Sequence, residues 1–153
     1  MKKVKDFMNP KVIYFKPEDS IFEVAKVFSE FDISGAPVVK DDKVIGVISE
    51  SDIVKFMSLK LGKKPTAPVL SLSLLVFSFI KDNVELKAEV SRISKTKIGD
   101  IMSKDIVSIP SEASMLEAAC VMEKRDINRL PVIDGEKLVG IIARADLIKA
   151  LIE

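Results

Sequence analysis

An internal duplication constrains the fold of this chain more than any other feature of its sequence. Residues 4–57 align without a gap onto residues 98–151, a constant displacement of 94 positions, with 16 identities among 54 aligned pairs. A lone unit of this size buries only about 60% of the surface of its unfolded chain and is marginally stable by itself. We therefore expect two copies of one small lobe that pack on each other. The identical pairs include Asp6/Asp100, Met8/Met102, Glu23/Glu117, Pro37/Pro131, Gly46/Gly140 and Asp52/Asp146.

The second half of each copy has the pattern of a β-hairpin. In residues 127–146 an apolar run that ends at Ile133 is followed by an Asp134-Gly135 turn and a second apolar run over 138–142. Residues 33–52 have the same layout. Two β-rich runs joined by an Asp-Gly turn are typical of a hairpin.

Each copy also has the signal for a capped helix before its hairpin. Ser20 stands three residues before Glu23, and Ser114 stands three residues before Glu117. This spacing is typical of a capping box at the start of a helix. Apolar residues then recur at helical intervals, so we predict amphipathic helices over 20–31 and from Ser114 onward.

The remaining segments complete a repeated β-α-β-β-α order. Short β-prone runs at 12–15 and 106–109 precede the capped helices, and a second helix is expected to begin near Ser51 and near Ala145. The fold class is therefore α/β (α+β).

Residues 58–97 have no counterpart elsewhere in the chain. They carry eight basic and three acidic residues, a net charge of +5, and the segment 60–68 is basic and rich in helix-breaking residues. The apolar stretch 68–80 is too short for the roughly 20 residues that span a bilayer. A helix buried against the lobes or a second subunit is expected, with membrane-surface contact, β structure or disorder as alternatives. A heptad seam supports the helix; its positions are Val69, Leu72, Val76, Phe79, Asn83, Leu86, Val90 and Ile93.

Composition excludes several classes of function. Histidine is absent, which removes zinc sites of the Cys/His type and histidine acid–base catalysis. Cys120 is the single cysteine, so no intramolecular disulfide forms. A net charge of +1 does not favour nucleic-acid binding. No secretory signal precedes the first copy, so a cytoplasmic location is expected. Phosphate-binding and dinucleotide-binding glycine motifs are absent, so we predict neither an enzyme nor catalytic or metal-binding residues.

The duplicated unit resembles the cystathionine-β-synthase (CBS) domain, and the tandem pair resembles a Bateman module. The likeness rests on the paired openings at 6–8 and 100–102, the Pro-apolar-apolar strand, and a Gly-apolar-apolar-x-x-x-Asp ending. It implies motif one at 1–57, a linker with a helical insert at 58–97, and motif two at 98–153. The insert is similar to those of some stand-alone archaeal members.

The resemblance implies a regulatory module. Two motifs would pack sheet to sheet about a pseudo-twofold axis and leave two clefts for AMP, ADP, ATP or S-adenosylmethionine, with no cofactor required. Two modules would form a disc-shaped homodimer. Ligand binding would change the conformation and so the activity of an unidentified effector protein.

The resemblance also implies which residues bind the ligand. In motif one, Asp52 would hold the ribose, Ser49 the ribose or phosphate, and Ser34, Ala36 and Pro37 the adenine. In motif two, Asp146 would hold the ribose, Asn128, Leu130 and Pro131 would lie beside the base, and Arg129 and Arg144 would reach phosphate. Ile13 and Val107 would be wall residues.

The two sites are expected to differ. Ala143 replaces the hydroxyl of Ser49, while Gly35 and Glu50 stand where motif two has its arginines. Motif two should therefore suit a phosphorylated ligand, and motif one a neutral or cationic adenosyl compound, or none.

Four alternatives remain open from the sequence. Asp52 and Asp146 could simply cap their helices, and Arg129 could pair with Asp126 or Glu123. The module could be a scaffold for dimerisation or docking that needs no ligand. The fourth alternative is nucleic-acid binding through the basic residues 58–64.

Overall fold

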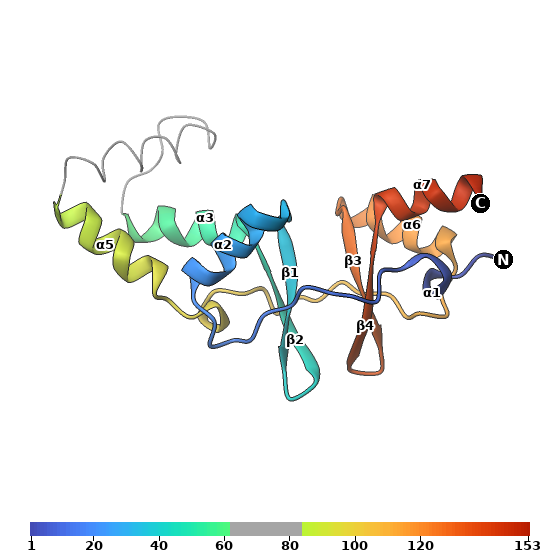
Figure 1. The fold of residues 1–153 in the computed structure, drawn as a ribbon, viewed down its shortest axis with the longest axis horizontal. Helices are drawn as coiled ribbons and strands as arrows, with labels where there is room; N and C mark the ends of the chain where they lie inside the picture. Colours follow the sequence, from blue (N-terminus) through green and yellow to red (C-terminus); the bar gives the residue numbers. More distant parts are fainter. Residues whose placement is uncertain (62–83) are drawn as a thin grey trace. The chain divides into compact units, whose positions relative to one another are not determined.

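The computed structural model of the chain describes residues 1–61 and 84–153 (Figure 1). The heptad positions from Val69 to Asn83, the apolar stretch 68–80 and most of the basic segment 60–68 lie outside these residues. The end of the expected seam is helical: α5 spans Val84–Ser94, contacts α2 (Ile21–Phe31), and buries Ile93 to 3% exposure.

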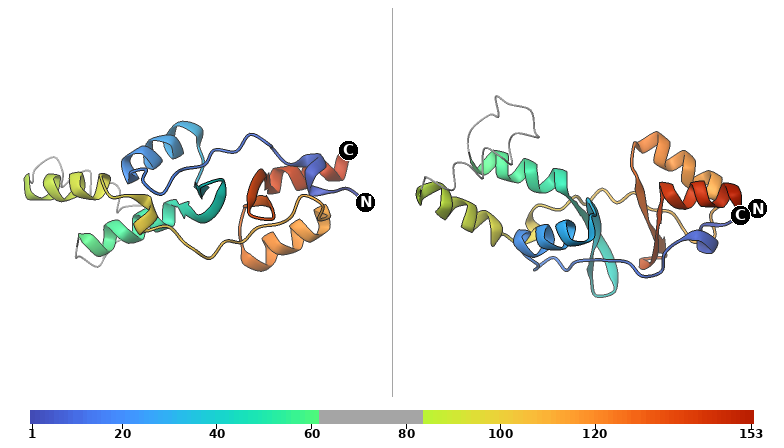
Figure 2. Two further views of the ribbon diagram at one scale, coloured as in Figure 1. Left: turned by 90° about the horizontal axis from the view of Figure 1, so that it is seen from below. Right: turned by 45° about the horizontal axis from the view of Figure 1, so that its top comes forward.

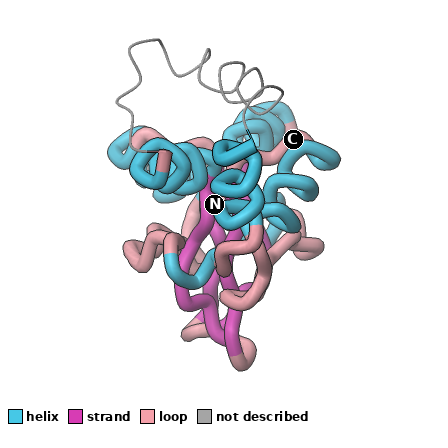
Figure 3. The backbone as a smooth tube through the Cα atoms, turned by 90° about the vertical axis from the view of Figure 1, so that its left-hand side faces the viewer, coloured by secondary structure: helices cyan, strands magenta, loops and turns pink. Residues whose placement is uncertain are grey.

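The described residues confirm a mixed α/β fold in which strands occur as two hairpins (Figure 3). None of the described helices is long and apolar enough to cross a membrane. In chain order the elements are α1 (Val4–Phe7), α2 (Ile21–Phe31), β1 (Gly35–Lys40), β2 (Lys43–Ser49), α3 (Glu50–Lys60), α5 (Val84–Ser94), η1 (Ile98–Asp100), α6 (Met115–Arg125), β3 (Arg129–Asp134), β4 (Lys137–Ala143) and α7 (Arg144–Ile152).

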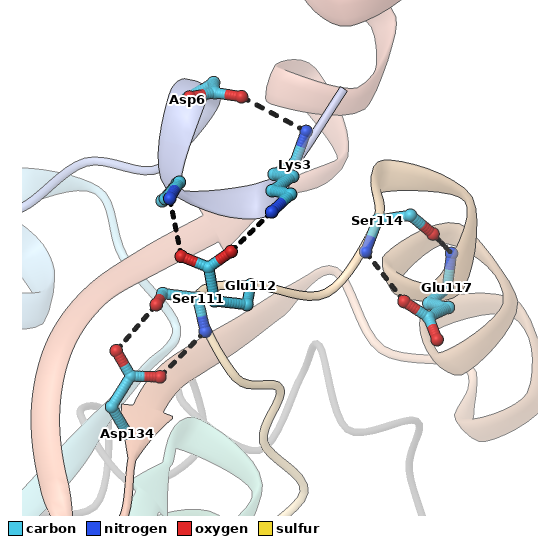
Figure 4. A network of polar contacts seen from close by, with 8 residues as sticks. Lys3, Asp6, Ser111, Glu112, Ser114, Glu117 and Asp134 are labelled. Atoms are coloured by element: carbon cyan, nitrogen blue, oxygen red, sulfur yellow. Dashed lines mark hydrogen bonds and ion pairs between the residues drawn. The ribbon is translucent and has the colours of Figure 1, made fainter. Parts of the chain in front are cut away.

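The serine-capped helix starts are confirmed. The Ser20 hydroxyl accepts a hydrogen bond from the Glu23 N–H at 3.1 Å, and the Ser114 hydroxyl accepts one from the Glu117 N–H at 3.1 Å. At α6 the Glu117 carboxylate also accepts from the Ser114 N–H at 2.7 Å, which completes the capping box (Figure 4). At α2 the described residues show only the serine half.

The first predicted strand of each copy is reduced to a single parallel bridge. Phe15 bridges to Val38, and Ile109 bridges to Val132. Ile109 donates to the Pro131 carbonyl at 3.1 Å and accepts from Ile133 at 3.0 Å. The next ladder bond would need an N–H from Pro131, and proline has none. The proline that marks each hairpin therefore also ends the parallel ladder.

The second hairpin is confirmed as predicted. β3 pairs with β4 antiparallel from Arg129↔Ala143 to Asp134↔Lys137. The turn places its positive φ of 66° on Gly135, where glycine has no steric cost. α6 and α7 contact each other, α6 packs on β3, and α7 packs on β4 (Figure 1).

The two copies exchange their leading segments, residues 2–9 and 96–103. Val4 in the first copy donates to the Ala113 carbonyl in the second at 2.8 Å, and Ile98 in the second donates to the Asp19 carbonyl in the first at 2.8 Å. Each atom pair maps onto the other by the 94-residue displacement. Figure 2 shows the N-terminal segment beside α7, which α1 contacts.

The chain accordingly divides into two compact units that interleave the copies. Unit one contains Met1–Phe15, Pro37–Val47 and Lys104–Glu153, whereas unit two contains Lys16–Ala36 and Ile48–Ser103. The sequence boundaries at 57/58 and 97/98 remain a prediction.

The core of unit one mixes residues from both ends of the chain. Val4, Leu130, Val132 and Ile142 are completely buried in it. Met8 is partly buried against this core. The rest of the buried core is Ile109, Met115, Ala118, Met122 and Ala150.

A polar network holds the N-terminal segment on unit one (Figure 4). The Glu112 carboxylate pairs with Lys3 and Lys5 through separate oxygens. Nearby, two groups of Ser111 donate to the Asp134 carboxylate, the hydroxyl at 2.6 Å and the backbone N–H at 2.9 Å. These two hydrogen bonds lower the pKa of Asp134. The hydrogen bonds from Lys3 and then Lys5 lower the pKa of Glu112 from 4.5 to about 2.

We expect Glu112→Gln to lower the melting temperature by a few degrees at pH 6 and by less at acid pH. Because folding lowers the pKa of Glu112, its contribution is complete above about pH 4.5 and disappears as the pH falls toward 2. Thermal melts of both proteins from pH 6 to pH 2.5 would measure this, with the exposed Glu123→Gln as control. A difference that stays constant over that range would contradict the assignment.

Candidate functional site

Both copies place a carboxylate in the first turn of the helix that follows the hairpin. Asp52 accepts from the Ser49 N–H at 3.0 Å at the start of α3, and Asp146 accepts from the Ala143 N–H at 2.8 Å at the start of α7. The capping role considered from the sequence is thus present. In each case the bond goes to Oδ2, and Oδ1 accepts no hydrogen bond from the described residues. One oxygen of each partly buried carboxylate therefore accepts no hydrogen bond from the part of the chain that the structure describes.

Ser49 is committed to its own helix. Its hydroxyl donates to Asp52 Oδ2 at 3.0 Å and accepts from the Asp52 N–H at 3.2 Å. A hydroxyl has one proton, so donation to a ribose or phosphate would require Ser49 to release Asp52. Ala143 offers no side-chain hydrogen bond at the matching position, as expected from the sequence.

A backbone hydrogen bond ties each of these helices to the start of its hairpin. Glu50 donates to the Ser34 carbonyl at 2.9 Å, and Arg144 donates to the Asn128 carbonyl at 3.1 Å. The predicted base-contact residues Ser34 and Asn128 are therefore held beside the helix starts that carry the carboxylates.

The two predicted phosphate arginines have different surroundings. Arg144 Nε donates to the Ile127 carbonyl at 3.3 Å, and Nη2 lies 3.8 Å from Asp126 Oδ1. Arg129 is exposed and forms no ion pair within the described residues. The pairing with Asp126 that we considered for Arg129 is made by Arg144.

The predicted adenine-slot residues are mostly core residues. Ala36 is 6% exposed, Pro37 is below 2%, Leu130 is at 0%, and Pro131 is buried. Their side chains fill the interior, and the carbonyls of Pro37 and Pro131 already accept hydrogen bonds from the N–H groups of Phe15 and Ile109. Val107 is partly buried and packs on the core of unit one.

The units divide the predicted residues unequally. The complete second set lies in unit one. Ser34, Ala36, Ser49 and Asp52 lie in unit two, while Ile13 and Pro37 belong to unit one. The described residues contain no group of three or more Asp, Glu or Cys side chains that could hold a metal ion.

Sequence reasoning did not single out the residue that ends the first long helix of each copy. Asp32 and Asp126 are left-handed C-caps with φ of 50° and 51°. Their identity across the copies was the available signal, because aspartate tolerates this conformation better than most residues.

Comparisons with known proteins agree with this architecture. A family model described as "CBS domain" matches residues 4–59 and 98–153. The uncharacterised protein MJ1426 of Methanocaldococcus jannaschii is 36% identical over 156 residues, which cover 97% of this chain and 90% of that protein.

Solved structures show the same fold. One of them is CBSX2 from Arabidopsis thaliana, in complex with AMP. It has a TM-score of 0.69 and 24% identity to this chain, and the match covers 99% of this chain and 97% of that one. The CBS domain pair of MJ0100 with 5′-methylthioadenosine and S-adenosyl-L-methionine has a TM-score of 0.65 and 20% identity, covering 99% and 96%. The predicted pair of CBS motifs is confirmed.

Proposed function

Because the chain belongs to the CBS-domain family, we propose that it is a regulatory module that binds adenosine-containing ligands beside the starts of α3 and α7. The observation that carries the proposal is that the carboxylate at each helix start caps its helix with only one of its two oxygens. Oδ2 of Asp52 and of Asp146 caps its helix, and Oδ1 accepts no hydrogen bond within the described residues. A carboxylate held in this way accepts hydrogen bonds from a ribose diol without first losing its own support.

The backbone around the carboxylate suits the rest of such a ligand. The backbone hydrogen bonds from Glu50 to Ser34 and from Arg144 to Asn128 hold the predicted base-contact residues Ser34 and Asn128 beside these helix starts. The ligands named for CBSX2 and MJ0100, AMP and methylated adenosyl compounds, support the adenosine class.

We propose that the module acts on another protein chain rather than as an enzyme. A ligand that binds one arrangement of the two copies more tightly shifts the population toward it and changes the surface that a partner meets. The exchange of leading segments gives this mechanism a route, because a change at one copy acts on residues of the other.

The proposal includes a homodimer. Phe22 on α2 and Leu116 on α6 occupy equivalent positions in the two copies and are 62% and 66% exposed. Large apolar side chains at matched exposed positions favour a symmetric partner.

A ligand panel tests the proposed function. We expect AMP, ADP, ATP, adenosine, methylthioadenosine or S-adenosylmethionine to raise the melting temperature, by roughly 5–10 °C at a ligand concentration of about 100 Kd. Asp52→Ala and Asp146→Ala should each remove part of the shift, and the double variant all of it.

Glu117→Ala is the matched control. Glu117 accepts from the N–H of its cap residue as Asp146 does, but it has no predicted ligand role. It should lower the ligand-free melting temperature and keep the full ligand shift. The same shift in the double variant, or no shift with any compound in the unmodified protein, would leave the ligand-independent scaffold as the better account.

A further inference from the structure

The two copies have the same backbone where the first long helix meets the hairpin, but one of the two charged side chains there differs in sign between the copies. We call Asp32 with Glu50 the first corner, and Asp126 with Arg144 the second corner. The aspartates have φ and ψ of 50° and 50° in one copy, and 51° and 53° in the other. The next residues, Ile33 and Ile127, complete the match with 3.1 Å and 3.0 Å bonds back to their helices.

Only the second corner joins opposite charges. The Arg144 side chain is folded back, with Nε on the Ile127 carbonyl and Nη2 3.8 Å from Asp126 Oδ1. Asp126 is fully exposed and Arg144 is 48% exposed, so this pair is in contact with water and weak. At the first corner both side chains, Asp32 and Glu50, are exposed carboxylates.

These corners adjoin the proposed ligand sites directly. Arg144 is two residues before Asp146 and donates its backbone N–H to Asn128. Glu50 has the same relation to Asp52 and Ser34. A charge on the ribose substituent of a ligand at either site would therefore be near the corner of the same copy.

We propose that Asp126 competes with an anionic ligand for the Arg144 guanidinium, so that the second corner sets how strongly its site prefers phosphorylated over uncharged adenosine compounds. This inference rests on the proposed function. The like-charged first corner has no cation to offer and repels a phosphate, so its site takes adenosine compounds without one.

The expected effects follow from charge alone. An AMP phosphate carries about −1.5 to −2 at pH 7. A carboxylate that does not touch the phosphate, and is screened by water and salt, changes AMP binding about threefold. Removing the charge of Asp126 both lowers this repulsion and frees Arg144, whereas reversing the charge of Arg144 acts at shorter range and should cost about tenfold.

The experiment measures AMP and adenosine binding by calorimetry in an Asp52→Asn background. This substitution weakens the first site, so the measured binding is that of the second site. Asp126→Asn should tighten AMP binding about threefold in 50 mM salt and less in 500 mM salt, and should leave adenosine binding unchanged. Arg144→Glu should weaken AMP binding about tenfold and should weaken adenosine binding much less. Glu123→Gln, an exposed neighbour on α6 with the same change of net charge, should alter neither.

The mirror variant tests the first corner. In an Asp146→Asn background, Glu50→Arg should tighten AMP binding about tenfold without changing adenosine binding. Asp126→Asn that leaves AMP binding unchanged or weaker, while adenosine still binds, would overturn the inference and leave the proposed function standing. If adenosine and AMP both fail to bind the unmodified protein, the proposed function fails and the role of the corners with it.

Discussion

Replacing Ile98 with alanine is expected to destabilise the first copy, although Ile98 belongs to the second copy by sequence. Ile98 is completely buried and donates its N–H to Asp19 in unit two. Truncation of a buried isoleucine to alanine costs about 2–5 kcal/mol. Hydrogen exchange should therefore show lost protection in α2, the helix that follows Asp19, before α6 is affected.

The reciprocal variant makes this test specific. Val4 is equally buried but packs in unit one, so Val4→Ala should cost about 2 kcal/mol and expose α6 first. Lys11→Ala, an exposed change in the same N-terminal region, should have no measurable effect. If each substitution weakens mainly the copy that contains it in sequence, the exchange of leading segments is wrong.

This exchange could not be predicted from local sequence rules. Val4 and Ile98 are both apolar and hold equivalent places in the duplication, so either could fill either core. Ser20 and Ser114 are different, because a cap acts on an N–H three residues away and its partner is fixed by the sequence itself. Features determined within one turn or one hairpin were therefore predicted correctly, and pairing between distant segments was not.

The short parallel strands illustrate a second limit. The β-prone run before Ile109 favours a strand, and Ile109 does form a bridge. Its ladder stops because the neighbouring strand contributes Pro131, which cannot donate. Only the pairing register shows that this proline faces the ladder.

For the candidate site, the sequence predicted where its residues lie in their helices and strands, but not which partners their side chains bind. The spacing placed Asp52 and Asp146 in the first turn of a helix, as the structure shows. It could not show that Ser49 uses its only proton on Asp52, or that Arg144 folds back toward Asp126. A side chain such as Arg144 can reach different partners in different rotamers, and the sequence does not show which of these rotamers it adopts.

Gly140→Ala is expected to destabilise unit one by about 1–3 kcal/mol, because a well-packed site has no room for the added methyl group. A Cβ built on Gly140 would lie 2.5 Å from Met8 Sδ and 3.2 Å from the Asn9 carbonyl oxygen. The Met8 side chain can move, but Asn9 is held by paired 2.9 Å hydrogen bonds with Ile141. Chemical denaturation of the variant should measure the loss as a lower midpoint with an unchanged slope.

A double-mutant cycle with Met8→Ala separates this clash from other effects of the substitution. Met8→Ala removes the closest atoms, so Gly140→Ala should cost less in its presence, with a coupling energy of about 0.5–3 kcal/mol. Gly35→Ala is the control, because the nearest atom to its added Cβ is 3.4 Å away, an ordinary contact. If the losses of unfolding free energy caused by Gly140→Ala and Met8→Ala are additive, Met8 does not restrict the space at position 140. Gly140 would then be needed for another reason.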